Sequence, residues 1–268
     1  MHSACDHGAV LDASREAGVM NELRLGRYQD ALADVEWDAC IFDAPYSART
    51  HIGHDSGAES SNDADRPDIR GNRARQAAGL RAMRKHLPYT SWSDSDVRDC
   101  VGFISPRTKG WIVSITDDVL APAWASAMEA AGRYVFAPLP LVETGSRVRL
   151  TGDGPSSWTC WVVVARPRRA PYSKWGTLPG AYIVPRESKP ITGGKPLGAM
   201  RDIVRDYSRD GDLVCDPCAG AGTTLLAARM EGRAYIGAEA DPDTHALATR
   251  RLAHMPTVPG QPALFGDP

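Results

Sequence analysis

The amino-acid sequence predicts an α/β protein built around a mostly parallel, doubly wound sheet. From Leu23 onward, apolar strand-like runs alternate with helical patterns, which is the order that a parallel sheet requires. Near the C-terminus, a glycine-rich turn joins one buried strand directly to a helix. With 268 residues, of which 43% are hydrophobic, the chain is long enough to bury a full core.

Strands are predicted where short apolar runs are bounded by Gly, Pro or Asp. In chain order, these runs are residues 22–26, 38–43, 110–117, 133–143, 158–167, 211–217 and 233–241. Helices are predicted where apolar residues recur at helical spacing, in one case behind an acidic first turn. The predicted helices are residues 93–105, 121–132, 196–208 and 223–232.

One large domain is predicted from residues 21–143 together with residues 191–254. Residues 144–190 interrupt the alternation with Gly, Pro and one hairpin-like pair of strands. Residues 53–75 have the composition of a mobile loop, and residues 255–268 form a Pro-punctuated segment that predicts a flexible tail.

The composition indicates a globular protein of a reducing compartment. No run approaches the length of a membrane span, and the N-terminal residues lack the order of a signal peptide, so we expect an intracellular protein. The six cysteines are scattered, and several lie in apolar runs, which suits buried thiols better than a disulfide framework. The net charge of -2 gives no overall attraction to nucleic acid.

The segment CDPCAGAGTT, residues 215–224, is the most informative part of the chain. A turn of small residues lets a ligand approach the backbone, and Glu239 at the end of the next strand can accept hydrogen bonds from ribose hydroxyls. Taken alone, the turn is equally compatible with a purely structural role. Cys215 and Cys218 form a C-x-x-C pair, but no second Cys or His pair completes a metal site, so no metal is predicted.

Three ordered motifs together resemble the amino-directed DNA methyltransferases of the beta class. CDPCAGAGTT is similar to the family's S-adenosylmethionine loop D-P-F-x-G-S-G-T-T, and DAPY at residues 43–46 is similar to its D-P-P-Y box. Lys195-Pro196-Leu197 matches the usual K-P-L lead-in to the helix before the loop. The resemblance implies a Rossmann-like S-adenosylmethionine-dependent methyltransferase fold, in which residues 144–190 are a small target-recognition insertion.

The resemblance also implies how DAPY would act on an exocyclic amino group. Such a nitrogen is a poor nucleophile because its lone pair is delocalised into the ring, and acceptors for its hydrogens support the charge that develops on transfer. Asp43 would supply one acceptor, and the carbonyl of Ala44, held by Pro45, would supply the other. Tyr46 would stack on a base that has left the duplex. The alternative is a carboxylate that caps the next helix beside an ordinary turn.

Cofactor roles follow from the same resemblance. Loop residues would surround the methionine end of the cofactor, and two threonines would add hydrogen-bond donors at the start of the helix. An acid at the end of the next strand would hold the ribose, and the lysine of the lead-in would also contact the cofactor. These residues are Lys195, Asp216, Pro217, Cys218, Ala219, Gly220, Gly222, Thr223, Thr224 and Glu239.

Two positions depart from the family pattern. Ala44 stands where the family has a first proline, which leaves a less rigid turn. Arg27 follows Gly26 where the family has an acid that helps to hold the cofactor's adenine, and we considered Asp30 as a substitute.

Basic residues in two segments are predicted to contact double-stranded DNA, either at phosphates beside the flipped base or at base edges, although solvated side chains explain many such runs. They are Arg66, Arg70, Arg73, Arg75, Arg81 and Arg84 in the first segment, and Arg147, Arg149, Arg166, Arg168, Arg169 and Lys174 in the second. Tyr89 and Trp92 are placed either in the core or in the substrate pocket.

The predicted activity is site-specific DNA methylation from S-adenosylmethionine, without a metal or a covalent enzyme intermediate. The leading Asp of DAPY favours adenine N6 over cytosine N4. Methylation of RNA or of a modified base, and a catalytically weak cofactor-binding DNA scaffold, are the alternatives.

The C-terminal tail carries a second pattern. Gln261, Leu264 and Phe265 have the spacing of peptides that dock into bacterial sliding clamps, or they pack on their own domain. A homodimer and a cytoplasmic location beside the nucleoid DNA are further expectations.

Overall fold

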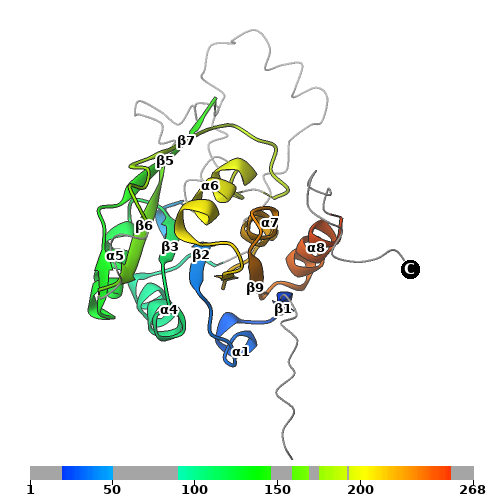
Figure 1. Ribbon diagram of the computed structural model, residues 1–268, viewed down its shortest axis with the longest axis horizontal. Coiled ribbons are helices and arrows are strands. Elements are labelled where there is room, and N and C mark those ends of the chain that lie inside the picture. The colour runs from blue at the N-terminus through cyan, green and yellow to red at the C-terminus, as the bar shows by residue number, and fades with distance from the viewer. Residues whose placement is uncertain (1–19, 51–89, 146–158, 169–174, 192, 255–268) are drawn as a thin grey trace, which may run out of the picture.

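A nine-stranded mixed sheet organises the part of the chain that the computed structural model describes, residues 20–50, 90–145, 159–168, 175–191 and 193–254 (Figure 1). The strands lie in the order β1-β9-β8-β2-β3-β6-β5-β7, and β4 pairs with β6 beside this path. Most neighbours are parallel, whereas β6 is antiparallel to β3, β4 and β5. The predicted Rossmann-like fold is confirmed.

The strands are short and mostly buried, as expected for a sheet covered on both faces. They are β1 Asn21–Leu25, β2 Ala39–Asp43, β3 Ile112–Thr116, β4 Arg133–Val135, β5 Leu139–Thr144, β6 Thr159–Pro167, β7 Tyr182–Pro185, β8 Leu213–Asp216 and β9 Ala234–Glu239.

Helices cover both faces of the sheet (Figure 1). They are α1 Tyr28–Ala31, α4 Asp94–Arg107, α5 Ala121–Ala130, α6 Leu197–Tyr207, α7 Thr223–Met230 and α8 Pro242–Ala253. Side chains of α6, α7 and α8 share one core with Ile41 of β2, whereas side chains of α1, α4 and α5 share the other with Phe42. The alternation of neighbouring β2 residues between the two cores follows from the period of a strand.

The parallel strands bring their carboxyl ends to one edge of the sheet. Leu25 at the end of β1 pairs with Glu239, and Asp216 at the end of β8 pairs with Gly237 of the same strand, β9. Asp43 at the end of β2 pairs with Ile115 of β3. Because loops that leave this edge are close together, the two motifs of the sequence meet there.

The predicted helices are all present, but several details differ from the prediction, and the short helix α1 was not predicted. The strand expected over residues 133–143 is divided into β4 and β5, and Pro138 in the gap has no N–H for the ladder. α4 continues two residues past the predicted end and includes Pro106. α8 was not predicted, although Asp241 caps it by accepting a hydrogen bond from the Thr244 N–H at 2.8 Å.

The segment 144–190 contributes two strands to the sheet. β6 lies between β3 and β5, and β7 forms the end of the strand order. The boundaries predicted for a separate recognition region therefore include part of the main sheet. Target recognition by the remainder of this segment stays a prediction, because residues 146–158 and 169–174 lie outside the described residues.

Among the described residues, no helix is both long and apolar enough to cross a membrane.

The side chain of Trp124 in α5 packs against the sheet near the end of β2. Its side chain is fully buried, and its ring lies 5.4 Å from that of Phe42 and 6.0 Å from that of Trp92, measured between centroids. We expect Trp124→Ala to lower the free energy of unfolding by about 3–5 kcal/mol, because it leaves a large cavity. Urea denaturation checks this value. Ile183→Ala, at a side chain that is 68% exposed, is the matched control and should change stability by less than about 1 kcal/mol.

Candidate active site

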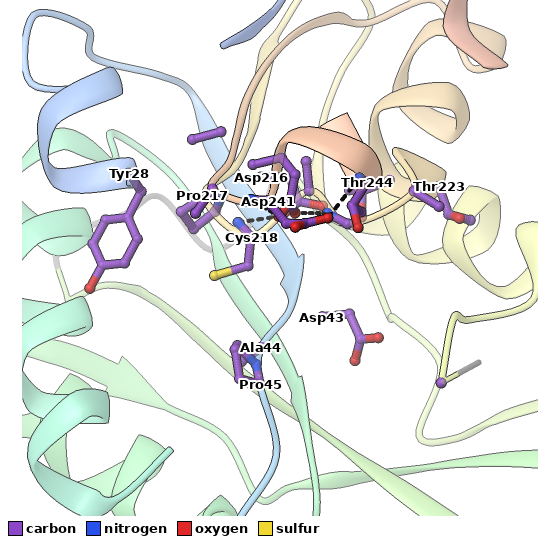
Figure 2. A pocket seen from close by; sticks show the side chains of 18 of the residues that line it. Tyr28, Asp43, Ala44, Pro45, Asp216, Pro217, Cys218, Thr223, Asp241 and Thr244 are labelled. Carbon is purple, nitrogen blue, oxygen red and sulfur yellow. Dashed lines mark hydrogen bonds between the residues drawn. The ribbon is translucent and has the colours of Figure 1, made fainter. Parts of the chain in front are cut away.

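A cavity of about 580 Å³ opens at the carboxyl edge of β1, β9, β8 and β2. Figure 2 shows the carboxylate of Asp43 and the side chains of Asp216 and Cys218 bordering the same space. The cavity thus joins the DAPY turn to the glycine-rich turn, although the two are far apart in the sequence.

Backbone and side-chain hydrogen bonds hold the DAPY turn on both sides. The Ala44 N–H donates to the Ile115 carbonyl at 3.2 Å, and the Trp92 N–H donates to the Tyr46 carbonyl at 2.9 Å. Ala44 is 2% exposed, and its methyl group packs in the core on the α4 and α5 face. The turn is therefore anchored although Ala44 replaces the first proline of the family pattern.

Asp117, at the end of β3, fixes the residues that follow the turn. Its Oδ2 accepts hydrogen bonds from the Ser47 N–H at 3.0 Å, the Ser47 hydroxyl at 2.6 Å and the Thr50 hydroxyl at 2.7 Å. Its Oδ1 accepts one from the Leu120 N–H at 3.0 Å. Burial opposes ionisation of Asp117, but these hydrogen bonds together lower its pKa. The sequence analysis did not identify this residue.

Asp43 is paired with Lys195 inside the cavity. The Lys195 Nζ donates to Asp43 Oδ2 at 2.7 Å and to the Gly193 carbonyl at 3.1 Å. The other oxygen, Oδ1, is buried and has no hydrogen-bond partner by geometry among the described residues. Burial raises the pKa of Asp43, and Lys195 acts in the opposite direction. The sequence analysis had placed Lys195 with the cofactor, so its pairing with Asp43 is new.

Tyr46 lies beside this ion pair. Its hydroxyl donates to the Cys160 Sγ at 3.2 Å, and the Lys195 Nζ lies 4.8 Å from the centroid of its ring. Asp43, Ala44 and Pro45 line the cavity, whereas Tyr46 does not in this conformation. Stacking of Tyr46 on a base stays a prediction.

The glycine-rich turn is shaped by hydrogen bonds to two carboxylates. The Cys218 N–H donates to Asp216 Oδ1 at 3.0 Å, and the Gly220 N–H donates to Glu239 Oε2 at 2.8 Å. Gly222 has a φ of 76°, and a Cβ there would lie 3.3 Å from that of Ala248. Glycine is favoured at Gly222 because its backbone is left-handed and α8 packs closely against it.

Two further contacts complete the loop. Thr223 and Thr224 both line the cavity, and Thr224 is buried and hydrogen-bonds Asp216. Arg251 of α8 donates to the Ala221 carbonyl and, at 3.3 Å, to the Thr223 hydroxyl. The sequence analysis did not identify Arg251, because α8 itself was not predicted. Cys215 and Cys218 are free thiols.

The cavity carries an excess of acidic side chains, which suits a cationic ligand. Those that line it are Asp43, Asp96, Asp99, Asp216, Glu239 and Asp241, against the basic Arg27 and Lys195. Burial, with the nearby charges of Asp43 and Glu239, raises the pKa of Asp216 to about 7.

Gln29 occupies the end of the cavity near Gly26. It lines the cavity, and its Oε1 is buried without a hydrogen-bond partner in the described chain. Arg27 lines the cavity as well, whereas Asp30, considered as a substitute for the missing acid, does not. The sequence carries no motif that would have singled out Gln29.

The predicted DNA contacts fall mostly outside the described residues. Those outside are Arg66, Arg70, Arg73, Arg75, Arg81, Arg84, Arg147, Arg149, Arg169 and Lys174, together with Tyr89 and the tail residues Gln261, Leu264 and Phe265. Trp92 lines the cavity and packs on Trp124, so it belongs to both the pocket and the core.

Arg166 does not fit its predicted DNA contact. Its side chain is 6% exposed, and its guanidinium lies 4.7 Å from the centroid of the Tyr134 ring. Because β6 runs antiparallel to β3, Arg166 and the exposed Arg168 lie at the sheet edge where β3 begins, away from the cavity. This position argues against a contact of either residue with DNA that enters the cavity.

One family model matches more than half of the chain. Residues 88–250 match the family model described as DNA methylase, N6_N4_Mtase. The type II methyltransferase M.HindIII of Haemophilus influenzae is 40% identical over 58 residues, which are 22% of this chain and 19% of that protein. The chain covers between 19% and 32% of the length of the curated relatives that it matches.

Solved methyltransferases share the fold. The M1.HpyAVI complex with SAM aligns with a TM-score of 0.61 and 17% identity, covering 86% of this chain and 98% of that one. The PvuII DNA methyltransferase, described as cytosine-N4-specific, aligns with a TM-score of 0.56 and 12% identity, covering 85% of this chain and 84% of that one.

The raised pKa of Asp216 predicts how stability changes with pH. This carboxyl keeps its proton in the folded state up to a pH of about 7, whereas in the unfolded chain it ionises near 3.8, so folding becomes less favourable as the pH rises between these values. Asp216→Asn removes the carboxyl group and, with it, this loss of stability as the pH rises. We expect it to stabilise the ligand-free protein by about 2 kcal/mol more at pH 8 than at pH 5, measured by urea denaturation.

Asp118→Asn is the control for that measurement, because the Asp118 side chain is 58% exposed. It should leave the pH dependence of the wild type in place. An Asp216→Asn variant with the same pH dependence as the wild type would contradict the placement of a buried, easily protonated carboxyl at this site.

Proposed function

Since the chain belongs to the DNA methylase family, we propose that it transfers a methyl group from S-adenosylmethionine to the exocyclic amino group of a DNA base. The observation that carries the proposal is the cavity that brings Asp43 of the DAPY turn and Asp216 of the glycine-rich turn together. Methyl transfer needs the methyl donor and the acceptor base in one water-poor site. In this cavity the glycine-rich turn would hold the donor, and the DAPY turn would hold the base.

The residues of the cavity fit S-adenosylmethionine at three points. Its sulfonium and ammonium groups are cations, which the acidic lining would favour over water. Its ribose hydroxyls would donate to Glu239, whose two oxygens already accept from the Gly220 and Asp241 N–H groups but keep further acceptor capacity. Gly220 lines the cavity and has no side chain, which leaves room for a close approach to the backbone.

Gln29 would recognise the adenine of the cofactor in place of the missing acid at position 27. A side-chain amide offers an acceptor and a donor side by side, which matches the amino group and the adjacent ring nitrogen of adenine. The Oε1 of Gln29 is buried without a partner in the described chain, so a rotation of the side-chain amide would be needed to bring it to the adenine amino group. Burying such an atom without a partner is costly, so a ligand that satisfies it gains affinity.

The described residues then act on the target base as acceptors and as a positioning surface. Asp43 accepts a hydrogen bond from the amino group, and the carbonyl of Ala44 accepts the other. Positive charge develops on this nitrogen during the transfer, and the carboxylate stabilises it. The base must leave the duplex to reach the cavity, and Tyr46 would stack on it there. S-adenosylmethionine supplies the electrophilic methyl group.

We propose adenine N6 as the methylated position, on the leading Asp of DAPY. Cytosine N4 is the second candidate, because it presents the same amino group beside a ring nitrogen and because the similar PvuII enzyme is described as cytosine-N4-specific. Methylation of RNA or of a modified base would use the same chemistry.

Recognition of double-stranded DNA is assigned to segments that the structure does not describe. We propose that the basic residues between Arg66 and Arg84 contact phosphates and that residues 146–158 and 169–174 contain the site-specific contacts. Docking of the tail to a sliding clamp, a homodimer and a location beside DNA in the cytoplasm remain proposals from the sequence.

Asp43→Ala tests the catalytic assignment. We expect the rate of methyl transfer to unmethylated genomic DNA to fall at least about 100-fold, because the acceptor that supports the charged amino group is lost. Labelled methyl incorporation measures the rate, and mass spectrometry of the nucleosides distinguishes N6-methyladenine from N4-methylcytosine. Asp210→Ala is the control, because the Asp210 side chain is 91% exposed on the surface.

Calorimetric titration with S-adenosylmethionine completes this test. Asp43→Ala should still bind the cofactor, which separates lost chemistry from a lost fold. If the wild type binds cofactor and DNA but transfers no methyl group, the protein is instead a cofactor-binding scaffold.

Gln29→Leu tests the adenine assignment. We expect the affinity for S-adenosylmethionine to fall about tenfold or more, because the substitution removes hydrogen bonds in a buried site. Asp30→Ala is the matched control, since Asp30 does not line the cavity, and it should bind as the wild type does. The reverse order of effects would show that Asp30, and not Gln29, replaces the missing acid.

A further inference from the structure

Lys195 is held in the catalytic cavity by three groups at once. Its Nζ lies 2.7 Å from Asp43 Oδ2, 3.1 Å from the Gly193 carbonyl and 4.8 Å from the centroid of the Tyr46 ring. The residue is 7% exposed, so its ammonium group is largely withdrawn from water. A buried lysine of this kind is stable only when it is paired with a negative charge.

The chain before α6 is built to hold Lys195 in this place. Glu187 accepts hydrogen bonds from the Leu197 N–H at 2.7 Å and the Gly198 N–H at 3.1 Å, so it satisfies the first turn of α6. Gly193 has a φ of 85°, a conformation that glycine adopts at little cost, and its carbonyl accepts from the lysine two residues later. The start of the helix and its lead-in therefore fix the lysine stem.

The surroundings of Asp43 make this contact decisive for its charge. Burial favours the neutral carboxyl, and the carboxyl of Asp216 is close enough for its own pKa to be affected by Asp43. Lys195 opposes the effect of burial on Asp43 most strongly, and Tyr46 and the more distant Lys189 assist it. Lys189 is itself paired with Glu143. Without Lys195, the described neighbours of Asp43 would leave a buried carboxylate with weak compensation.

We propose that Lys195 is a positioning residue for methyl transfer, which holds Asp43 as an oriented, ionised carboxylate at the site of the target amino group. The inference rests on the proposed function of the same cavity. A protonated Asp43 would present a hydroxyl to the amino group on one oxygen and would lose the negative charge that stabilises the transition state. Lys195 acts on the target through Asp43, in contrast to the cofactor contact that the family resemblance implies for it.

Lys195→Met and Lys195→Arg separate this role from a structural one. NMR titration of the Asp43 carboxyl carbon, assigned with Asp43→Asn, reports the ionisation of Asp43 whether or not a substrate is methylated. We expect the midpoint to rise by about one pH unit or more in Lys195→Met and to stay near the wild-type value in Lys195→Arg. Lys189→Met is the matched control from the same segment and should shift the midpoint much less.

Single-turnover methylation of unmethylated genomic DNA is then measured from pH 5.5 to 9 with saturating cofactor. In Lys195→Met the rate at pH 7 should fall at least about tenfold, and the acid limb of the pH profile should move upward with the carboxyl midpoint. The affinity for S-adenosylmethionine should change less than about threefold, since the lysine is paired with Asp43. Lys195→Gln replaces Lys195→Met if the latter does not fold.

Three outcomes would overturn the inference: an unchanged carboxyl midpoint, a Lys195→Met enzyme faster than the wild type, or a loss confined to cofactor affinity. A faster variant would mean that the lysine blocks Asp43 from the base. A wild type that methylates no nucleic acid at any pH overturns the proposed function instead, and the NMR titration still decides whether Lys195 controls the charge of Asp43.

Discussion

Parallel pairing of β2 with β8 is the constraint on which the site depends. Ala39 pairs with Val214 and Cys40 with Cys215, so the strand that ends in Asp43 lies beside the strand that ends in Asp216. The two halves of the cavity come from opposite ends of the chain, and only this pairing brings them together. Successive side chains of each strand enter the two cores alternately. A slip of one residue would therefore move each side chain into the opposite core and displace the two carboxylates relative to each other.

Gathering carboxylates in one cavity creates an electrostatic conflict that the fold resolves in different ways. Asp43 is paired with Lys195, and Glu239 accepts the Gly220 N–H of the glycine-rich turn. Asp117, which lies outside the cavity, is satisfied by four hydrogen bonds behind the DAPY turn. Among the described residues, Asp216 has hydrogen bonds with the Cys218 N–H and Thr224, but burial outweighs them and its pKa is raised. A site that destabilises its own ligand-free state in this way is prepared to gain energy from a cationic ligand.

The two departures from the family pattern have different structural consequences. At Ala44, the hydrogen bond to Ile115 holds the backbone where the family pattern has its first proline, and Asp117 holds Ser47 just after the turn. At Arg27, the lost acid is not replaced by the neighbouring Asp30, and the cavity instead presents the amide of Gln29. The DAPY turn is therefore held in place without the first proline, while the end of the cavity near Gly26 offers a neutral amide where the family pattern has an acid.

The sequence by itself determined the class of fold, the central strands and the two loop motifs, because alternating apolar periods and glycine-rich turns are local properties of the chain. It also located Asp43, Asp216 and Glu239 at strand ends. Only the tertiary structure decided which distant groups meet them. Lys195 pairs with Asp43, Arg251 binds the cofactor turn and Arg166 is buried at the far sheet edge, since such contacts depend on strand order and packing and leave no local pattern.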